Sequence, residues 1–305
     1  RAITVTGPGI TNTTVISGLM LTGGNTQSFG GGLWIRNGAQ PTIRNTVIEN
    51  NRAAFGGGVY IGAGSSAELD NVTIRDNSAT IYGGGMYSSG NATLSKCQVV
   101  SNTASSDGGG LYTEGIVNLI SSEIISNVVT GAGGGIFAAG PLTLQTARLS
   151  GNAGTQGGGL FSEGITTVTD TLLTDNTSTG DGAAMYTRHT LTASGLRMIG
   201  NVSTNGRGGG LFAAASFTLL SAEIADNGAS LGGGGLYHDN GVGLVVNTLL
   251  ARNTNGALYL DSPDRLDAIH TTIASANMNP SHAIYVADGG ANITNTIIVE
   301  ICFLR

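Results

Sequence analysis

The chain has 305 residues, of which 51 are glycine, only 5 are proline and 40% are hydrophobic. This composition excludes a disordered glycine-rich linker, which lacks apolar residues, and collagen, which needs glycine at every third position and abundant proline. The formal net charge is −6, no basic run occurs and no apolar run is long enough to span a bilayer, so neither nucleic acid nor membrane insertion is expected.

Residues 1–29 form an irregular first segment, after which a glycine-rich block recurs along the chain. Each block has three glycines, one apolar residue and one aromatic residue, and the period is ~25 residues over about eleven copies. Intact copies begin at Gly30, Gly56, Gly83, Gly108, Gly133, Gly157, Gly208 and Gly233, and degenerate copies begin at Gly182, Asn255 and Ser281.

A second motif, an apolar residue followed three positions later by asparagine, runs in phase with the glycine block. Before each asparagine, apolar and polar residues alternate, as in Leu142–Leu144 and Ala147–Leu149, which predicts strands with one buried face. The asparagines of this motif are Asn51, Asn77, Asn102, Asn127, Asn152, Asn176, Asn201, Asn227 and Asn253.

Three short strands and three turns in ~25 residues are typical of one coil of a parallel β-helix. We therefore predict an all-β, right-handed parallel β-helix of about eleven coils, forming a rod on the order of 50 Å long. The chain is a single domain in which residues 1–29 form the first coil, 30–286 the regular coils, and 287–305 the last coil and terminus.

The glycine block alternating with an apolar-x-x-Asn motif resembles the repeats of chlamydial polymorphic outer-membrane proteins and of related bacterial surface proteins. The similarity covers roughly residues 20–300, although Ile, Leu, Val or Met stands where the chlamydial repeat has Phe. The resemblance implies the β-helix fold, an extracellular or cell-surface location and an adhesin-like role.

Equivalent positions of stacked coils form columns, and two of these columns are interpreted as structural. Asparagine tolerates left-handed backbone at a turn, and its amides can hydrogen-bond from coil to coil, so we expect Asn127→Ala to destabilise by roughly 1–3 kcal/mol. The glycines permit positive φ or a close approach between coils. Cys97 falls on a column of small inward residues and is expected to be buried and inert, too far along the rod from Cys302 for a disulfide.

The aromatic column should point outward, because the apolar residue before each ring points inward. Such a ladder offers a surface for glycan or for another protein, whereas the alternative is that neighbouring rings cover one another and stiffen the stack. The second interpretation is favoured, because the column is as regular as the repeat itself. Its members are Trp34, Tyr60, Tyr87, Tyr112, Phe137, Phe161, Tyr186, Phe212, Tyr237, Tyr259 and Tyr285.

Two residues beyond the aromatics, one column carries the only constellation that suggests chemistry. Asp239 and Asp261 fall on adjacent coils, where paired carboxylates either raise a pKa or hold a cation, although two separately solvated carboxylates are the simpler interpretation. In the same column Glu163 and Arg188 are expected to form a surface ion pair.

No loop is long enough to wall a substrate cleft, and the charged residues are scattered, so we expect no catalytic residues and no cofactor. The histidines 189, 238, 270 and 282 show no metal-ligand spacing. A polysaccharide lyase or hydrolase of the β-helix type is the alternative, and residues 238–283 are where its active site would be sought. Ice binding through the column of Thr42, Thr93, Thr143, Thr167, Thr192 and Thr218 is disfavoured, because the neighbouring column is mixed.

The expected function is that of a non-catalytic extracellular module whose partners are glycans or other protein subunits. Because the terminal coils of a solenoid have unpaired strand edges, the ends are a further surface for subunit stacking. The chain begins at Arg1 without a methionine and ends in an apolar stretch, which is typical of a processed or truncated chain.

Overall fold

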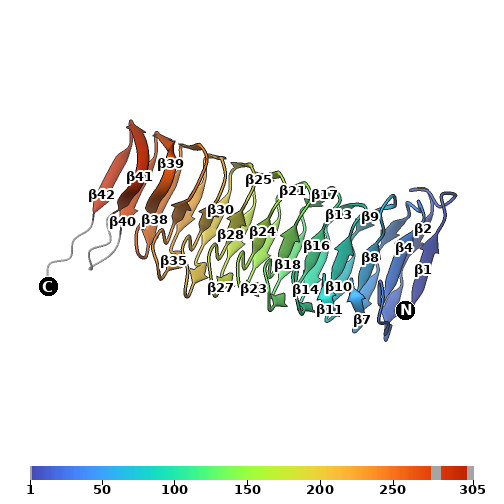
Figure 1. The fold of residues 1–305 in the computed structure, drawn as a ribbon. Coiled ribbons are helices and arrows are strands. Elements are labelled where there is room, and N and C mark those ends of the chain that lie inside the picture. The colour runs from blue at the N-terminus through green and yellow to red at the C-terminus, as the bar shows by residue number, and fades with distance from the viewer. Residues whose placement is uncertain (1, 276–282, 301–305) are drawn as a thin grey trace.

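The computed structural model describes residues 2–275 and 283–300. Within these ranges every regular element is a β-strand, and the chain advances as one continuous solenoid from the N-terminal to the C-terminal end (Figure 1). Since the described residues contain no helix, they also contain none capable of crossing a membrane. The predicted all-β parallel solenoid of about eleven coils is confirmed.

The first strand of each coil follows the glycine block and pairs in parallel with its equivalent in the next coil, as in Phe137 with Phe161. Glycines precede these strands because the turn that leads into each strand has a positive φ, which glycine adopts readily. The first series comprises β1 (Ile3–Thr6), β4 (Leu33–Arg36), β8 (Val59–Ile61), β12 (Met86–Ser88), β16 (Leu111–Thr113), β20 (Ile136–Ala138), β24 (Leu160–Ser162), β28 (Met185–Thr187), β32 (Leu211–Ala213) and β36 (Leu236–His238).

The second strand of each coil is the predicted alternating segment. Its series comprises β2 (Val15–Ser17), β5 (Thr42–Arg44), β9 (Ser66–Asp70), β13 (Asn91–Ser95), β17 (Val117–Ile120), β21 (Leu142–Gln145), β25 (Thr166–Thr169), β29 (Leu191–Ser194), β33 (Phe217–Leu220) and β37 (Gly243–Val246). The long strands β39 (Leu258–Ile269) and β41 (Ile284–Thr294) continue both series, which therefore form one 22-stranded sheet.

The third strand of each coil precedes the position of the ladder asparagine and belongs to a 12-stranded sheet. Its members are β3 (Met20–Thr22), β6 (Val47–Glu49), β10 (Thr73–Arg75), β14 (Gln98–Val100), β18 (Glu123–Ile125), β22 (Arg148–Ser150), β26 (Leu172–Thr174), β30 (Arg197–Ile199), β34 (Glu223–Ala225), β38 (Leu249–Asn253), β40 (Thr272–Ser275) and β42 (Ile297–Glu300).

A short strand after the asparagine adds an 8-stranded sheet that the repeat pattern did not predict. In most coils it has only two residues, too few to show an alternation in the sequence. The short series comprises β7 (Arg52–Phe55), β11 (Ser78–Tyr82), β15 (Thr103–Ala104), β19 (Val128–Val129), β23 (Ala153–Gly154), β27 (Thr177–Ser178), β31 (Val202–Ser203) and β35 (Gly228–Ala229).

The interior of the solenoid is a continuous apolar core. Alternate residues of each strand face it, so Leu33 and Ile35 are fully buried, while Trp34 between them belongs to the outer side. Cys97 lies in this core, as predicted, with its Sγ 3.3 Å from the Leu69 carbonyl oxygen. Burial raises the pKa of its thiol to about 11, so it remains protonated and unreactive near neutral pH. Cys302 lies outside the described residues.

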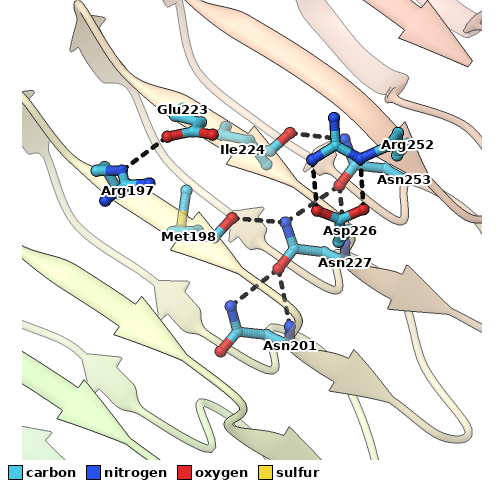
Figure 2. A network of polar contacts seen from close by, with 9 residues as sticks. All are labelled: Arg197, Met198, Asn201, Glu223, Ile224, Asp226, Asn227, Arg252 and Asn253. Carbon is cyan, nitrogen blue, oxygen red and sulfur yellow. Dashed lines mark hydrogen bonds and ion pairs between the residues drawn. The ribbon is translucent and has the colours of Figure 1, made fainter.

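The asparagine column is a buried hydrogen-bonded ladder. The side-chain oxygen of Asn227 accepts bonds from the backbone N–H and the side-chain amide of Asn201, and the Asn227 amide nitrogen donates to the Met198 carbonyl (Figure 2). Coil-to-coil bonding is thus as predicted. The left-handed backbone was expected at the asparagines but lies one residue earlier, for example at Ser126 and Asp226. The asparagine serves the ladder through its amide, while the turn before it is made by Asn, Asp, Ser or Gly in every coil of the ladder except the one with Arg252.

Both structural reasons for the glycines are found in one block. Gly133 has a φ of +69°, which is the left-handed region that favours glycine. At Gly134 a Cβ atom would lie 2.4 Å from the carbonyl oxygen of Gly158 in the next coil. The block therefore combines one backbone bend with one approach between coils that any side chain would prevent.

Candidate functional site

The predicted aromatic column is a continuous ladder on the outer side of the first strand series. From Tyr60 to Tyr285 the rings of successive coils stack, for example Phe137 on Phe161 with centroids 5.0 Å apart and Phe212 on Tyr237 with centroids 5.1 Å apart. The middle rings form a packed cluster separate from the interior core. The interpretation in which neighbouring rings cover one another therefore agrees with the geometry.

Much of this ladder is not a surface, which corrects the expectation of an exposed binding ladder. Only 2% of Phe161 and 1% of Tyr237 is exposed, because rings cover rings and small residues such as Ala132 and Ala214 pack on them. The buried members are Tyr87, Phe137, Phe161, Tyr186, Phe212 and Tyr237. The half-buried members are Trp34, Tyr60, Tyr112 and Tyr259, and Tyr285 in the last coil is 44% exposed.

Two of the buried tyrosines bond to carboxylates of the next coil. The Tyr87 hydroxyl donates to Glu114 Oε1 at 2.6 Å, and the Tyr237 hydroxyl donates to Asp261 Oδ2 at 2.5 Å. Burial, followed by these neighbouring carboxylates, raises the pKa of both tyrosines far above the usual range. Both hydroxyls consequently remain protonated, so they act as hydrogen-bond donors and not as bases.

The structure places Asp239 and Asp261 close enough to interact, as the column predicted. Burial and then the charge of Asp261 raise the pKa of Asp239, while the Arg207 guanidinium opposes this shift. Asp261 is paired in register with Asp288 instead of residue 287, because the strand register shifts after Leu260. The described residues contain no group of three or more His, Cys, Asp or Glu side chains that could hold a metal ion. A cation at the Asp239–Asp261 pair therefore stays a prediction without a third protein ligand in the described ranges.

His238, expected near a hypothetical active site, is directed into the solenoid interior. It is fully buried, with its Nε2 3.2 Å from the Asn240 carbonyl oxygen and its ring at an edge-to-face angle to Phe217, with centroids 5.1 Å apart. Its Nδ1 has no hydrogen-bond partner, and burial lowers its pKa. His238 is thus a neutral core residue that solvent and substrates do not reach.

The remaining surface predictions have simpler outcomes. Arg188 and Glu163 form the predicted ion pair, with Nη1 and Oε1 3.0 Å apart. Thr143, Thr167 and Thr192 are in register on successive coils, so the threonine column exists, while ice binding stays a disfavoured hypothesis. The positions 281 and 282 of the last degenerate block lie outside the described residues.

The sequence reasoning missed a second aromatic row at the position directly before the glycine block. It consists of Phe29, Phe55 and Tyr82 in three successive coils, which are half-buried and contact the main ladder, for example Phe29 against Tyr60 with centroids 4.5 Å apart. The signal was available in the sequence, because each of these rings directly precedes Gly30, Gly56 or Gly83. It was overlooked because the row ends after three coils and so does not belong to the general repeat.

A hollow of about 510 Å³ lies on the same three coils, and none of the three rings lines it. Its lining comes from the same three coils, immediately before each ring in the chain, and is mainly polar. The lining residues are Asn25, Thr26, Gln27, Arg52, Ala54, Thr80 and Ile81.

Comparison with known proteins gives one match. A family model described as a right handed beta helix region matches residues 7–145 of the chain. No curated protein and no solved structure shows significant similarity. Together with the parallel coils, the match supports a right-handed parallel β-helix repeat protein, which agrees with the predicted fold.

Proposed function

We propose that this right-handed parallel β-helix is a non-catalytic, extracellular or surface-displayed recognition module with an adhesin-like role. One observation supports this function above the others. The coils stack in register through nearly the whole described chain, so side chains of one position form a column with a spacing of about 4.8 Å. Such a surface presents the same chemical group repeatedly, which suits the binding of an equally repetitive partner.

The backbone that carries these columns is rigid in its construction. The apolar interior is continuous, and the buried asparagine ladder bonds each coil to the next, as Asn77 does with Asn102 through two bonds of 3.0 Å. A preorganised surface loses little conformational entropy when it binds. Repeated weak contacts along such a surface add through avidity, which favours attachment over the binding of one small ligand.

The extracellular setting of the proposal rests on the resemblance to bacterial surface proteins, and the partners that we propose are glycans or other protein subunits. The low proportion of charged residues agrees with partners of this kind, because a chain with 10% charged residues provides little electrostatic attraction for nucleic acid. The proposed partners are therefore polymers that contact the long side of the rod, or subunits that meet its ends.

A polysaccharide lyase or hydrolase is the second candidate, and the Asp239–Asp261 pair is the observation that favours it. A carboxyl group with a raised pKa next to a second carboxylate is the arrangement that general acid catalysis uses. Against this function, Asp261 is engaged by the Tyr237 hydroxyl at 2.5 Å. That bond occupies one carboxylate oxygen of Asp261 and links the residue to the packed aromatic ladder.

One set of measurements separates the two candidates. The chain is screened for binding on a glycan array and, in parallel, for lyase and hydrolase turnover on neutral and uronate polysaccharides. We expect binding without turnover. Turnover that disappears in both Asp239→Asn and Asp261→Asn, while Glu163→Gln in the same column retains it, refutes the non-catalytic function and supports the enzyme.

A further inference from the structure

We propose that the second aromatic row, together with the hollow on the same coils, is a saccharide-binding site confined to the first three coils. The site consists of Phe29, Phe55 and Tyr82 with the neighbouring ladder rings Trp34 and Tyr60, and is named the aromatic patch below. This inference rests on the proposed recognition function and specifies the class of its ligand and the place where it binds.

The fold does not require aromatic residues at this position. In later coils the residue before the glycine block is Asp107, Ala132, Gln156, Asp181, Arg207 or Gly232, and these coils pair with their neighbours in the same register. Three rings in three successive coils are therefore a local departure from the repeat. Since half-buried aromatic rings are unfavourable in water and unnecessary for stacking, they point to a binding role.

The rings of the patch are arranged differently from those of the buried ladder. Phe55 meets Tyr87 at 79° and Tyr82 at 45°, and Phe29 meets Tyr60 at 48°. In the middle of the ladder the corresponding angles are far smaller, such as 3° between Tyr112 and Phe137. Two other pairs of the second row are stacked, namely Phe29 with Phe55 at 30° and Tyr82 with Tyr112 at 28°. The patch is thus a two-row cluster of half-buried rings at mixed angles, whereas the ladder beyond it is a single closed stack.

The strands beneath the patch are longer than those at the same position elsewhere. Strands β7 and β11 have 4 and 5 residues, whereas the other strands of the short series, β15, β19, β23, β27, β31 and β35, have two residues each. Phe55 and Tyr82 are the terminal residues of β7 and β11, and Phe29 is bridged to Phe55. Two of the rings are therefore held at the ends of paired strands and the third by a backbone bridge to Phe55, which is what a preorganised site needs.

The hollow supplies the polar half of the site. Its volume of about 510 Å³ lies within the range of roughly 300–1,000 Å³ that is usual for small-molecule sites. Asn25 and Gln27 offer amides, Thr26 and Thr80 offer hydroxyls, and Arg52 offers a guanidinium as a donor. No carboxylate is among the residues that line it.

A saccharide matches this combination better than a protein does. Sugars present apolar C–H groups beside closely spaced hydroxyls, and here the amide, hydroxyl and guanidinium groups of the hollow belong to the chain segments that lead into the rings. A protein interface needs a larger apolar centre, of about 800 Å² on each partner, while this patch is two side chains wide. The length of three coils, about 10 Å between the first and the third, corresponds to a short oligosaccharide.

The test uses the complete chain and substitutions that the fold already accepts. Phe55→Gln and Tyr82→Gln introduce the residue type that Gln156 provides at the same position, and Gln156→Ala is the matched control. Each protein is titrated by calorimetry with hexasaccharides of glucose, N-acetylglucosamine, xylose and galacturonate. Thermal unfolding of each variant verifies that the solenoid is intact.

We expect at least one hexasaccharide to bind the unmodified chain, and each patch variant to lose affinity by roughly tenfold, with the control unchanged. Equal binding by the patch variants places the saccharide elsewhere and overturns this inference, while the recognition function stands. If no saccharide binds but beads coated with the chain still adhere to cell surfaces, the inference fails alone. If the chain neither binds a saccharide nor adheres, both proposals fail.

Discussion

Replacing Asn127 by alanine tests how much the asparagine ladder stabilises the solenoid. The Asn127 amide nitrogen donates to the Val99 carbonyl at 2.9 Å and to Asn152 Oδ1 at 3.0 Å. Its side-chain oxygen accepts from the Asn102 backbone N–H at 2.9 Å and from the Asn102 amide at 3.0 Å. The substitution removes all four bonds from a fully buried site.

The free-energy cost of Asn127→Ala depends on which of the four bonded groups keep another hydrogen bond in the variant. Asn152 Oδ1 still accepts the Asn127 backbone N–H, and the Asn102 amide still donates to Ile74. The Asn102 N–H loses the acceptor that the side chain supplied, whereas the Val99 carbonyl belongs to β14, which is paired with strands on both sides. A buried donor left unsatisfied costs about 1–3 kcal/mol, so we expect Asn127→Ala to lower the free energy of unfolding by about 1–3 kcal/mol.

Urea unfolding followed by circular dichroism gives this change, and hydrogen exchange of the Asn102 amide places it in the structure. Asn118→Ala, at an outward position of β17 in the same coil, is the control and should cost less than about 0.5 kcal/mol. We also expect Asn127→Asp to be at least as damaging, because a buried carboxylate would face the Val99 carbonyl. Equal stability of Asn127→Ala and Asn118→Ala would refute the reasoning.

Three further predictions concern buried groups. Burial lowers the pKa of His238 in the folded state. The contribution of His238 to stability is therefore complete above the unfolded pKa of about 6.5 and is lost as the pH falls below it, with a slope of up to about 1.4 kcal/mol per pH unit. His238→Leu should weaken this pH dependence of stability in denaturant titrations between pH 7.5 and 5. Gly134→Ala places a Cβ 2.4 Å from a backbone oxygen, whereas no atom lies within 4 Å of a Cβ at Gly290. Thermal unfolding should therefore show severe destabilisation in Gly134→Ala and little change in Gly290→Ala. The Cys97 thiol, with its pKa raised to about 11, should resist iodoacetamide at pH 8 in the native chain and react in urea, as mass spectrometry can verify; rapid native labelling contradicts its burial.

The repeat made the fold predictable, because a period of ~25 residues with two motifs in phase leaves few ways to bury the apolar positions. Inward positions such as Ile74 and Leu149 could be assigned from alternation alone. The two-residue strands of the short series could not be assigned in this way, because two residues are too few to show an alternation of apolar and polar positions. The backbone turn was assigned to the asparagines, and it lies one residue before them because the buried amide requires an extended backbone next to the turn.

The site was less predictable, because exposure depends on neighbours that are distant in sequence. Nothing local distinguishes the buried Phe161 from the half-buried Trp34, since the difference arises from the residues that pack on each ring. Similarly, the register shift after Leu260 changes the partner of Asp261, and column counting assumes a constant register. The row of Phe29, Phe55 and Tyr82 was within reach, had departures from the repeat been sought as carefully as the repeat itself.

Each coil in the described chain hydrogen-bonds only to the coil before it and the coil after it, so the molecule behaves as a linear array of interchangeable units. Excision of residues 133–156 would join Ala132 to Gly157, two positions with the same geometry as the original junction. The shortened chain would retain both motifs and lose about 4.8 Å of length. Gene-level duplication or loss of whole units can therefore adjust the reach of such a protein without redesigning its packing.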